Sequence, residues 1–264
     1  MRPPGPAFDV RSALTHEIRQ AQASLDGAFS AKDVHAGRVS LKRARAIARI
    51  GRDGAPGLAS VFDDSARAAM RLLAATRESA ALAASAREAA KESGRKAAEG
   101  LLTAADRIEF SASVATPGLQ EAIAAALKDL HALAQVWPEA SERQIARSVA
   151  SILRRARRAR RAGLASNDPD IRHKWRRREK ERLFAAEALG AAWPRRRQLK
   201  RAARLCEALG KERDAMLLAA RMSSIHVPAN AEPASESALK ALRKRAKHWG
   251  RRADKLGRDL TARA

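Results

Sequence analysis

A row of evenly spaced basic residues between positions 34 and 50 is the feature that most constrains the fold. Its members stand three or four residues apart: His35, Arg38, Lys42, Arg45 and Arg49. On an α-helix such intervals bring all five side chains to one face, because one turn takes about 3.6 residues. Apolar residues such as Leu41 and Ile47 fall on the other side. The segment is therefore predicted to be an amphipathic helix with one basic face.

Two further segments carry similar rows. A second row repeats the spacing 138 positions after His35, and its members are His173, Arg176, Arg177 and Lys180. A third row comprises Arg147, Arg154, Arg158 and Arg161. Because like charges in one line repel one another, we expect each row to bind a long anion. The recurrence of the same spacing about half a chain later also indicates an internal duplication.

The residues around these rows resemble a known family. The segment from His35 to Arg45 (H-A-G-R-V-S-L-K-R-A-R) resembles the first signature of the CHAD family, the conserved histidine α-helical domain. The segment from His173 to Glu187 is similar to the second signature, and Leu209 to Asp214 resembles the Leu-Gly-x-x-x-Asp turn that follows in that family. The similarity runs from about Phe8 to the C-terminal helix. Where the family usually has an arginine, this chain has Leu183. Arg182 stands one place earlier, and helical geometry turns it roughly opposite to His173.

The resemblance implies a helical fold with internal two-fold pseudo-symmetry and binding of inorganic polyphosphate along a basic central surface. The rows and the resemblance together predict a polyphosphate-binding set: His35, Arg38, Lys42, Arg43, Arg45, Arg49, Arg154, Arg158, Arg161, His173, Arg176, Arg177 and Lys180. Asp214 is expected to cap a helix or pair with an arginine rather than bind a metal.

Composition favours an all-α fold. Of the 264 residues, 45% are apolar, which excludes a disordered basic tail, and only 3% are aromatic. The apolar residues are mostly Ala and Leu, and no segment alternates with period two, so we expect no strand. The prediction is two antiparallel bundles of about four helices each, related by the pseudo-two-fold around a basic central cleft. Residues 1–8 are predicted to be a disordered lead, 9–137 the N-terminal half and 138–264 the C-terminal half.

Helix boundaries follow from capping residues and from Pro and Gly. Asp9 is a plausible N-cap of the first helix. The predicted segments are 9–29, 32–50, two or more helices in 58–113, 116–137, 139–164, 167–192, 195–209, 211–226 and 235–263.

The formal net charge of +24 is uneven. Residues 1–137 have a net charge of +4 and residues 138–264 a net charge of +20. Such an excess calls for a polyanion or an anionic surface as partner. Catalysis is not expected, because the chain has no Gly-rich phosphate loop, no zinc-ligand spacing and no clustered carboxylates. We predict a non-enzymatic protein without a cofactor.

Other features limit the location and chemistry of the protein. Its single cysteine, Cys206, excludes an internal disulfide and is expected to be a small buried residue. The N-terminal residues have no apolar core of a signal peptide, and no apolar run is long enough to span a bilayer. A cytoplasmic protein without membrane insertion is expected, with polyphosphate granules as one place of action.

Several alternatives stay open at this point. Lone histidines are commonly structural, and the third row could be a solvated basic face. The same holds for the predicted last helix, whose basic face comprises Lys240, Lys244, Lys247, Arg251, Lys255 and Arg258. The charge also allows nucleic-acid binding of the nucleoid type, although no helix-turn-helix signal stands out and aromatic side chains for stacking on single strands are few. A third possibility is a granule-surface scaffold that binds a partner helix through the Ala-rich segment 63–113. The oligomeric state is not predicted.

Overall fold

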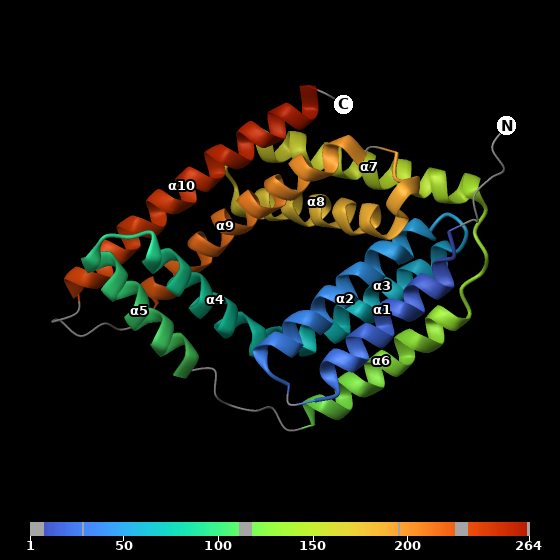
Figure 1. Ribbon diagram of the computed structural model, residues 1–264, viewed down its shortest axis with the longest axis horizontal. Coiled ribbons are helices and arrows are strands. Elements are labelled where there is room, and N and C mark those ends of the chain that lie inside the picture. The colour runs from blue at the N-terminus through green and yellow to red at the C-terminus, as the bar shows by residue number, and fades with distance from the viewer. Residues whose placement is uncertain (1–7, 28, 111–117, 195, 225–231, 263–264) are drawn as a thin grey trace. The chain divides into compact units, whose positions relative to one another are not determined.

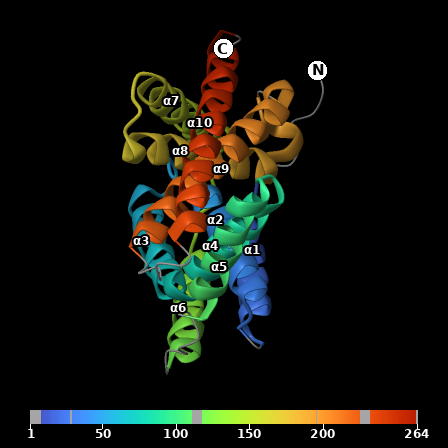
Figure 2. The same cartoon turned by 90° about the vertical axis from the view of Figure 1, so that its left-hand side faces the viewer.

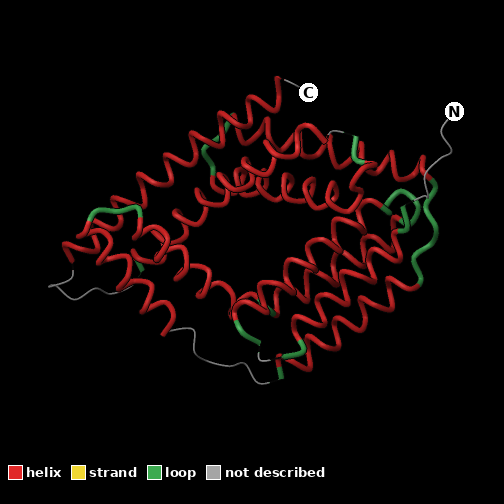
Figure 3. Tube along the Cα trace, viewed as in Figure 1, coloured by secondary structure: helices red, strands yellow, loops and turns green. Residues whose placement is uncertain are grey.

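The structure is a computed structural model of the chain, and it describes residues 8–27, 29–110, 118–194, 196–224 and 232–262. Within these ranges the chain forms ten α-helices, two short 3₁₀-helices and no strand (Figures 1 and 3). The prediction of an all-α fold is therefore confirmed. Of the predicted disordered lead 1–8, all but Phe8 lies outside the described residues. No described helix is both long and apolar enough to cross a membrane.

The helices occupy most of the described chain. The bounds are α1 Val10–Leu25, α2 Ala31–Ile50, α3 Pro56–Leu72, α4 Ala74–Lys91, α5 Arg95–Phe110, α6 Leu119–Gln135, α7 Glu142–Leu164, α8 Pro169–Leu189, η1 Gly190–Ala192, η2 Arg196–Gln198, α9 Leu199–Ser223 and α10 Glu232–Ala262.

Local capping explains where the first helices begin. The Asp9 carboxylate accepts a hydrogen bond from the Ser12 N–H at 3.0 Å, so the predicted N-cap of α1 is confirmed. Ser30 and Asp33 form a reciprocal capping box at the start of α2. Asp168 accepts from the N–H groups of Asp170 and Ile171 and caps α8. These polar side chains satisfy backbone donors that a helix leaves open at its N-terminus.

The predicted break at Gly210 is wrong. Instead of two helices that meet there, α9 runs without interruption from Leu199 to Ser223. A glycine inside a helix costs about 1 kcal/mol relative to alanine. Burial of Leu205, Leu209 and Leu218 on this helix outweighs that cost. The predicted ends of other helices differ from the observed ends by a few residues. For example, α1 ends at Leu25 instead of residue 29, and the α-helical part of α8 ends at Leu189 instead of residue 192.

The chain forms two compact units, each made of three separate segments. Unit 1 comprises the described residues of 1–74, 116–160 and 177–199, and unit 2 those of 75–115, 161–176 and 200–264. Each unit thus draws on both sides of residue 137. The predicted halves 9–137 and 138–264 describe an internal repeat of the chain, which the boundaries of compact units do not test. The division into these halves therefore stays a prediction.

Unit 1 is built around four helices in a closed ring of neighbours. α1 packs on α2, α2 on α3, α3 on α6 and α6 on α1 (Figure 1). Phe62 and Trp137 meet edge to face in the core, with ring centroids 5.9 Å apart. Arg11 donates two hydrogen bonds to the Trp137 carbonyl, at 3.0 and 2.7 Å. The first predicted basic helix, α2, is therefore a fixed element of this bundle.

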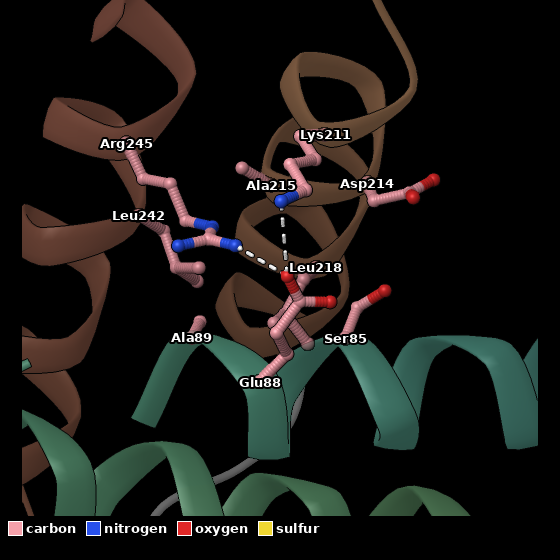
Figure 4. A pocket seen from close by; sticks show the side chains of 9 residues that line it. All are labelled: Ser85, Glu88, Ala89, Lys211, Asp214, Ala215, Leu218, Leu242 and Arg245. Atoms are coloured by element: carbon pink, nitrogen blue, oxygen red, sulfur yellow. Dashed lines mark hydrogen bonds and ion pairs between the residues drawn. The ribbon is translucent and has the colours of Figure 1, made fainter. Parts of the chain in front are cut away.

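Unit 2 has a core to which α4, α5, α9 and α10 all contribute. α4 and α5 lie side by side (Figure 2), and Arg87 of α4 pairs with Asp106 and Glu109 of α5. Glu88 of α4 is 3.4 Å from the Lys211 ammonium and 3.2 Å from the Arg245 guanidinium (Figure 4). These ion pairs join α4 to α9 and α10.

A buried arginine fixes the start of α8 within unit 2. Arg172 donates to Glu212 at 2.7 Å and to Asp254 at 2.9 Å. Next to it, Trp175 is completely buried and packs against Gly163 and Gly257, where a Cβ atom would come within 2.4 and 2.8 Å of the indole. This part of α8 also carries His173 and Arg176.

Candidate functional site

Two carboxylates in unit 1 are surrounded by arginines. Asp63 of α3 accepts hydrogen bonds from Arg45 and Arg49, both at 2.8 Å. Arg67 approaches the other carboxylate oxygen of Asp63 at 2.5 Å. The side chain of Asp63 keeps only 14% of its accessible surface, so these are partly buried, charge-assisted contacts.

Glu181 of α8 is the second centre. Its carboxylate lies 3.4 Å from Arg49, 3.7 Å from Arg155 of α7 and 2.7 Å from Arg178. Arg49 therefore connects the two acidic centres. Glu181 is buried, with a side-chain exposure of 6%.

We call this group the arginine cluster, and it comprises Arg45, Arg49, Arg67, Arg155, Arg177, Arg178, Asp63 and Glu181. Arg177 belongs to it because the charges of Arg45, Arg178 and Arg67 act on its guanidinium. Six arginines stand against these two carboxylates and against Asp64, which lies 3.2 Å from Arg67, so the formal excess is three positive charges. Such an excess in a partly desolvated place favours the binding of an anion.

The pKa values within the cluster reflect this excess. Burial, together with the neighbouring charges of Arg45 and Arg178, lowers the pKa of Arg49 to about 10, although Glu181 and Asp63 oppose the shift. Desolvation and nearby arginines also lower the pKa values of Arg155 and Arg177. Burial alone would raise the pKa of Asp63, but the hydrogen bond from Arg45 and the surrounding arginines hold it below its usual value. With a pKa of about 10, Arg49 remains charged at neutral pH.

The cluster also has donors to spare. The Nε atoms of Arg67 and Arg155 are buried and donate to no described residue. A buried donor without an acceptor is costly, and an anion oxygen would satisfy it.

The structure brings part of the first predicted row into the cluster. Arg45 and Arg49 are members, and Arg38 donates to the Met70 carbonyl of α3, the helix that also carries Asp63. Lys42 is half-buried and His35 is exposed.

Arg43 lies elsewhere in unit 1. It is 3.4 Å from Glu187 and lies over the Phe184 ring, with 5.9 Å to the centroid. Lys180 approaches the same ring at 5.6 Å. Two residues along a helix turn a side chain by about 200°, which explains why Arg43 and Arg45 face different neighbours.

The third predicted row divides between the units. Arg154 lines a hollow next to the cluster, and Arg147 binds Asp53 at 2.7 Å. Arg158 is exposed, and Arg161 belongs to unit 2.

The second predicted row is divided too. Arg177 and Lys180 lie in unit 1, while His173 and Arg176 lie in unit 2. Arg176 lies over Gly210 of α9, 3.5 Å from where a Cβ atom on that glycine would stand. Since His35 and His173 belong to different units, the prediction that they face one cleft stays a prediction.

The prediction that Arg182 points away from the second row stays a prediction. Arg182 is buried in unit 1 and lies 3.1 Å from Glu179, which also pairs with Arg160 at 2.9 Å. Leu183, in the place where the family usually has an arginine, is buried as well. The segment resembling the family's Leu-Gly turn lies inside α9, where Asp214 is half-buried (Figure 4).

Sequence reasoning missed five of the eight residues of the cluster. The missed residues are Arg67, Arg155, Arg178, Asp63 and Glu181. The pairs Asp63–Arg67 and Arg178–Glu181 have helical i,i+4 and i,i+3 spacing, a signal present in the sequence. The approach of Arg155 to Glu181 from another helix had no such signal.

Among the described residues no three His, Cys, Asp or Glu side chains gather in a way that could hold a metal ion. Cys206 is buried in α9, as predicted for a small apolar residue.

A family model described as the CHAD domain matches residues 12–223, which is more than half of the chain. The chain belongs to the CHAD family. The CHAD match contains the whole arginine cluster and ends where α9 ends, so that α10 lies beyond it. No curated protein matches the chain.

Proposed function

We propose that this CHAD protein binds inorganic polyphosphate without catalysis, and that the arginine cluster of unit 1 is a main contact. The family is linked to polyphosphate binding in general. The observation that supports the proposal most directly is the excess of three positive charges around Asp63 and Glu181. This excess includes buried donors that lack an acceptor among the described residues.

The chemistry of the cluster suits phosphate. A polyphosphate chain presents many anionic oxygens and no bases to read. Guanidinium groups bind pairs of such oxygens through parallel N–H donors, which an ammonium cannot do. Because all six cations of the cluster are arginines, several neighbouring phosphates of one chain can be bound in this way.

Titration of long-chain polyphosphate and of duplex DNA at physiological salt tests the proposal. We expect tighter binding of polyphosphate, and equal or tighter binding of DNA would contradict it. Arg45→Gln combined with Arg177→Gln should weaken polyphosphate binding by about a hundredfold or more, since each charge-assisted contact contributes roughly 1.5–3 kcal/mol.

A matched control removes the same charge elsewhere. Lys240→Gln with Lys244→Gln also takes away two positive charges, from exposed positions on α10. This variant should keep most of its polyphosphate affinity. An equal loss in both variants would show that bulk charge, not the cluster, carries the binding.

The wider prediction adds a second surface. It places the row with His173 and Arg176 on a central cleft related by pseudo-symmetry to the row on α2. Charge reversal at Arg38, Lys42, Arg176 and Lys180 should abolish polyphosphate binding while the helical circular dichroism stays intact. A crystal soaked with phosphate or sulfate would show whether anions settle near both histidines.

Granule targeting in the cytoplasm is part of the same proposal. A fluorescent fusion should collect on polyphosphate granules in cells that make polyphosphate and be dispersed in cells that do not. Persistent foci in the latter would favour the scaffold function. The apolar sides of α4 and α5, which that function would use, are buried within unit 2.

Nucleic-acid binding is a second candidate because of α10. Six cationic side chains on this helix are exposed: Lys240, Lys244, Lys247, Arg251, Lys255 and Arg258. Counterion release would give such a face weak, sequence-independent affinity for nucleic acid. The Lys240/Lys244 variant should then lose DNA binding, and a strong sequence preference in a selection experiment would make this the main function.

A further inference from the structure

A hollow beside the arginine cluster concentrates positive charge. It lies in unit 1 between the end of α2, the turn that leads into α3, and α7. Its charged lining comprises Arg49, Arg52, Arg147, Arg154, Arg155 and Asp53. Five arginines face one carboxylate, and that carboxylate is already bound to Arg147.

The walls of the hollow are fixed by bonds between the turn and α7. The Asp53 carboxylate accepts from Arg147 at 2.8 and 2.7 Å, and the Asp53 N–H donates to Ser148 Oγ at 3.0 Å. Gly51 begins the turn, where a Cβ atom would come within 2.6 Å of Trp137 Nε1. The turn is thus held close to the core, and its Arg52 is presented from a rigid support.

The beginning of α3 adds to the positive potential. This 17-residue helix starts at Pro56, which lines the hollow, and no side chain caps its first turn. The N-terminal N–H groups of a helix carry a partial positive charge that favours anions.

The hollow and the arginine cluster share two residues. Arg49 and Arg155 line the hollow and pair with Glu181. A chain of phosphates on the cluster therefore reaches the hollow without a gap in arginine contacts.

We propose that the hollow binds the terminal phosphate of a polyphosphate chain whose interior lies on the arginine cluster. This inference rests on the proposed function. A terminal phosphate ionises a second time with a pKa of about 6, as phosphate monoesters do. It then carries about twice the charge of an interior phosphate. The place with five arginines and an uncapped helix end suits that extra charge.

End-capped polyphosphate tests the inference. Two preparations of one chain length are compared, one free and one with both terminal phosphates converted to alkyl phosphoramidates, which keep one negative charge and cannot ionise a second time. The wild-type protein should bind the free form several-fold tighter at pH 8, on the order of tenfold. The ratio should shrink at pH 5.5, where the terminal phosphate loses its second charge. Terminal resonances in phosphorus NMR should also broaden before interior ones.

Variants locate the effect. Arg52→Gln with Arg154→Gln changes two exposed residues of the hollow, and it should bring the ratio of free to capped affinity close to one. Arg71→Gln with Arg143→Gln removes the same charge from exposed positions of unit 1 outside the hollow and should keep the ratio.

The outcomes separate the two proposals. Equal affinity of wild-type protein for free and capped chains overturns the terminal-phosphate site but leaves polyphosphate binding in place. An end preference that survives in the Arg52/Arg154 variant overturns it as well. Failure to bind either form overturns the proposed function together with this inference.

Discussion

At the scale of single residues, Arg49 pairs with Asp63 and Glu181 at once and also lines the hollow at the start of α3. Its lowered pKa of about 10 reports a guanidinium that has lost water and gained cationic neighbours. The carboxylates around it reduce the repulsion between the arginines but do not remove it. An anionic ligand would neutralise the positive charge that remains.

Replacement of Asp63 measures that repulsion. Asp63→Asn removes the countercharge of three arginines and should destabilise the protein by about 1–3 kcal/mol, below the range for a fully buried pair because the site is partly solvated. Tripolyphosphate should raise the melting temperature of the variant more than that of the wild type. Thermal unfolding with and without the ligand checks this, and an unchanged melting temperature of the variant would contradict it.

The pH dependence of this loss has a defined sign. Since the folded-state pKa of Asp63 is lowered, its stabilising effect is present above the ordinary carboxyl pKa of about 3.9 and disappears as the pH falls through the lower value. The difference between wild type and Asp63→Asn should therefore persist from pH 8 to pH 5 and close below about pH 4.

The effect of Glu17 on stability should depend on pH in the opposite direction to that of Asp63. Burial raises the pKa of Glu17, against the charge of Arg43, and its Oε2 atom is buried without a described partner. Ionisation of this carboxyl costs folding free energy once the pH exceeds its unfolded pKa. Glu17→Gln should be more stabilising at pH 8 than at pH 4. Denaturant unfolding at the two pH values measures the stability of both proteins. A larger gain in the free energy of unfolding at pH 4 than at pH 8 would be inconsistent with a raised pKa of Glu17.

At the scale of helices, the sequence predicted a local cap better than the continuity of a long helix. Asp9 caps the first helix as its position suggested, because a cap is a local interaction. Gly210 was misread as a break, since the burial that keeps α9 continuous involves residues distant in sequence. The same reason explains the site. The basic rows were visible as helical spacing, whereas Arg155 reaches Glu181 only after α7 and α8 have packed.

Helix packing in unit 2 should depend on the absence of a Cβ atom at Gly100. At Gly100 of α5 a Cβ atom would lie 2.4 Å from the Ala234 carbonyl oxygen of α10. Gly100→Ala should therefore destabilise the protein by about 1–3 kcal/mol, the usual range for overpacking. Chemical denaturation measures the loss.

Gly57→Ala is the matched control. Gly57 is a helical glycine of α3 with nothing within 4 Å of an added Cβ atom. There the substitution should be neutral or stabilising by up to about 1 kcal/mol. Equal losses at Gly57 and Gly100 would argue against close packing as the cause.

At the scale of the whole molecule, the net charge of +24 means that added salt should weaken the binding of polyphosphate. Neutralising the three excess charges of the arginine cluster should give a slope of log affinity against log salt of about −2, from roughly 0.7 per charge on a single-stranded polyanion. Arg45→Gln should reduce that slope by about one unit. Polyphosphate titrations between low and high salt measure both slopes. A slope that is the same in the variant would place Arg45 outside the contact.

The order of the segments has a consequence for synthesis. Unit 1 takes its last segment from 177–199, after the chain has already contributed twice to unit 2. A growing polypeptide therefore exposes the arginines of α2 long before Glu181 leaves the ribosome. During that interval ribosomal RNA is the nearest polyanion, and the early acidic neighbour Asp63 is the one carboxylate of the cluster available to shield them.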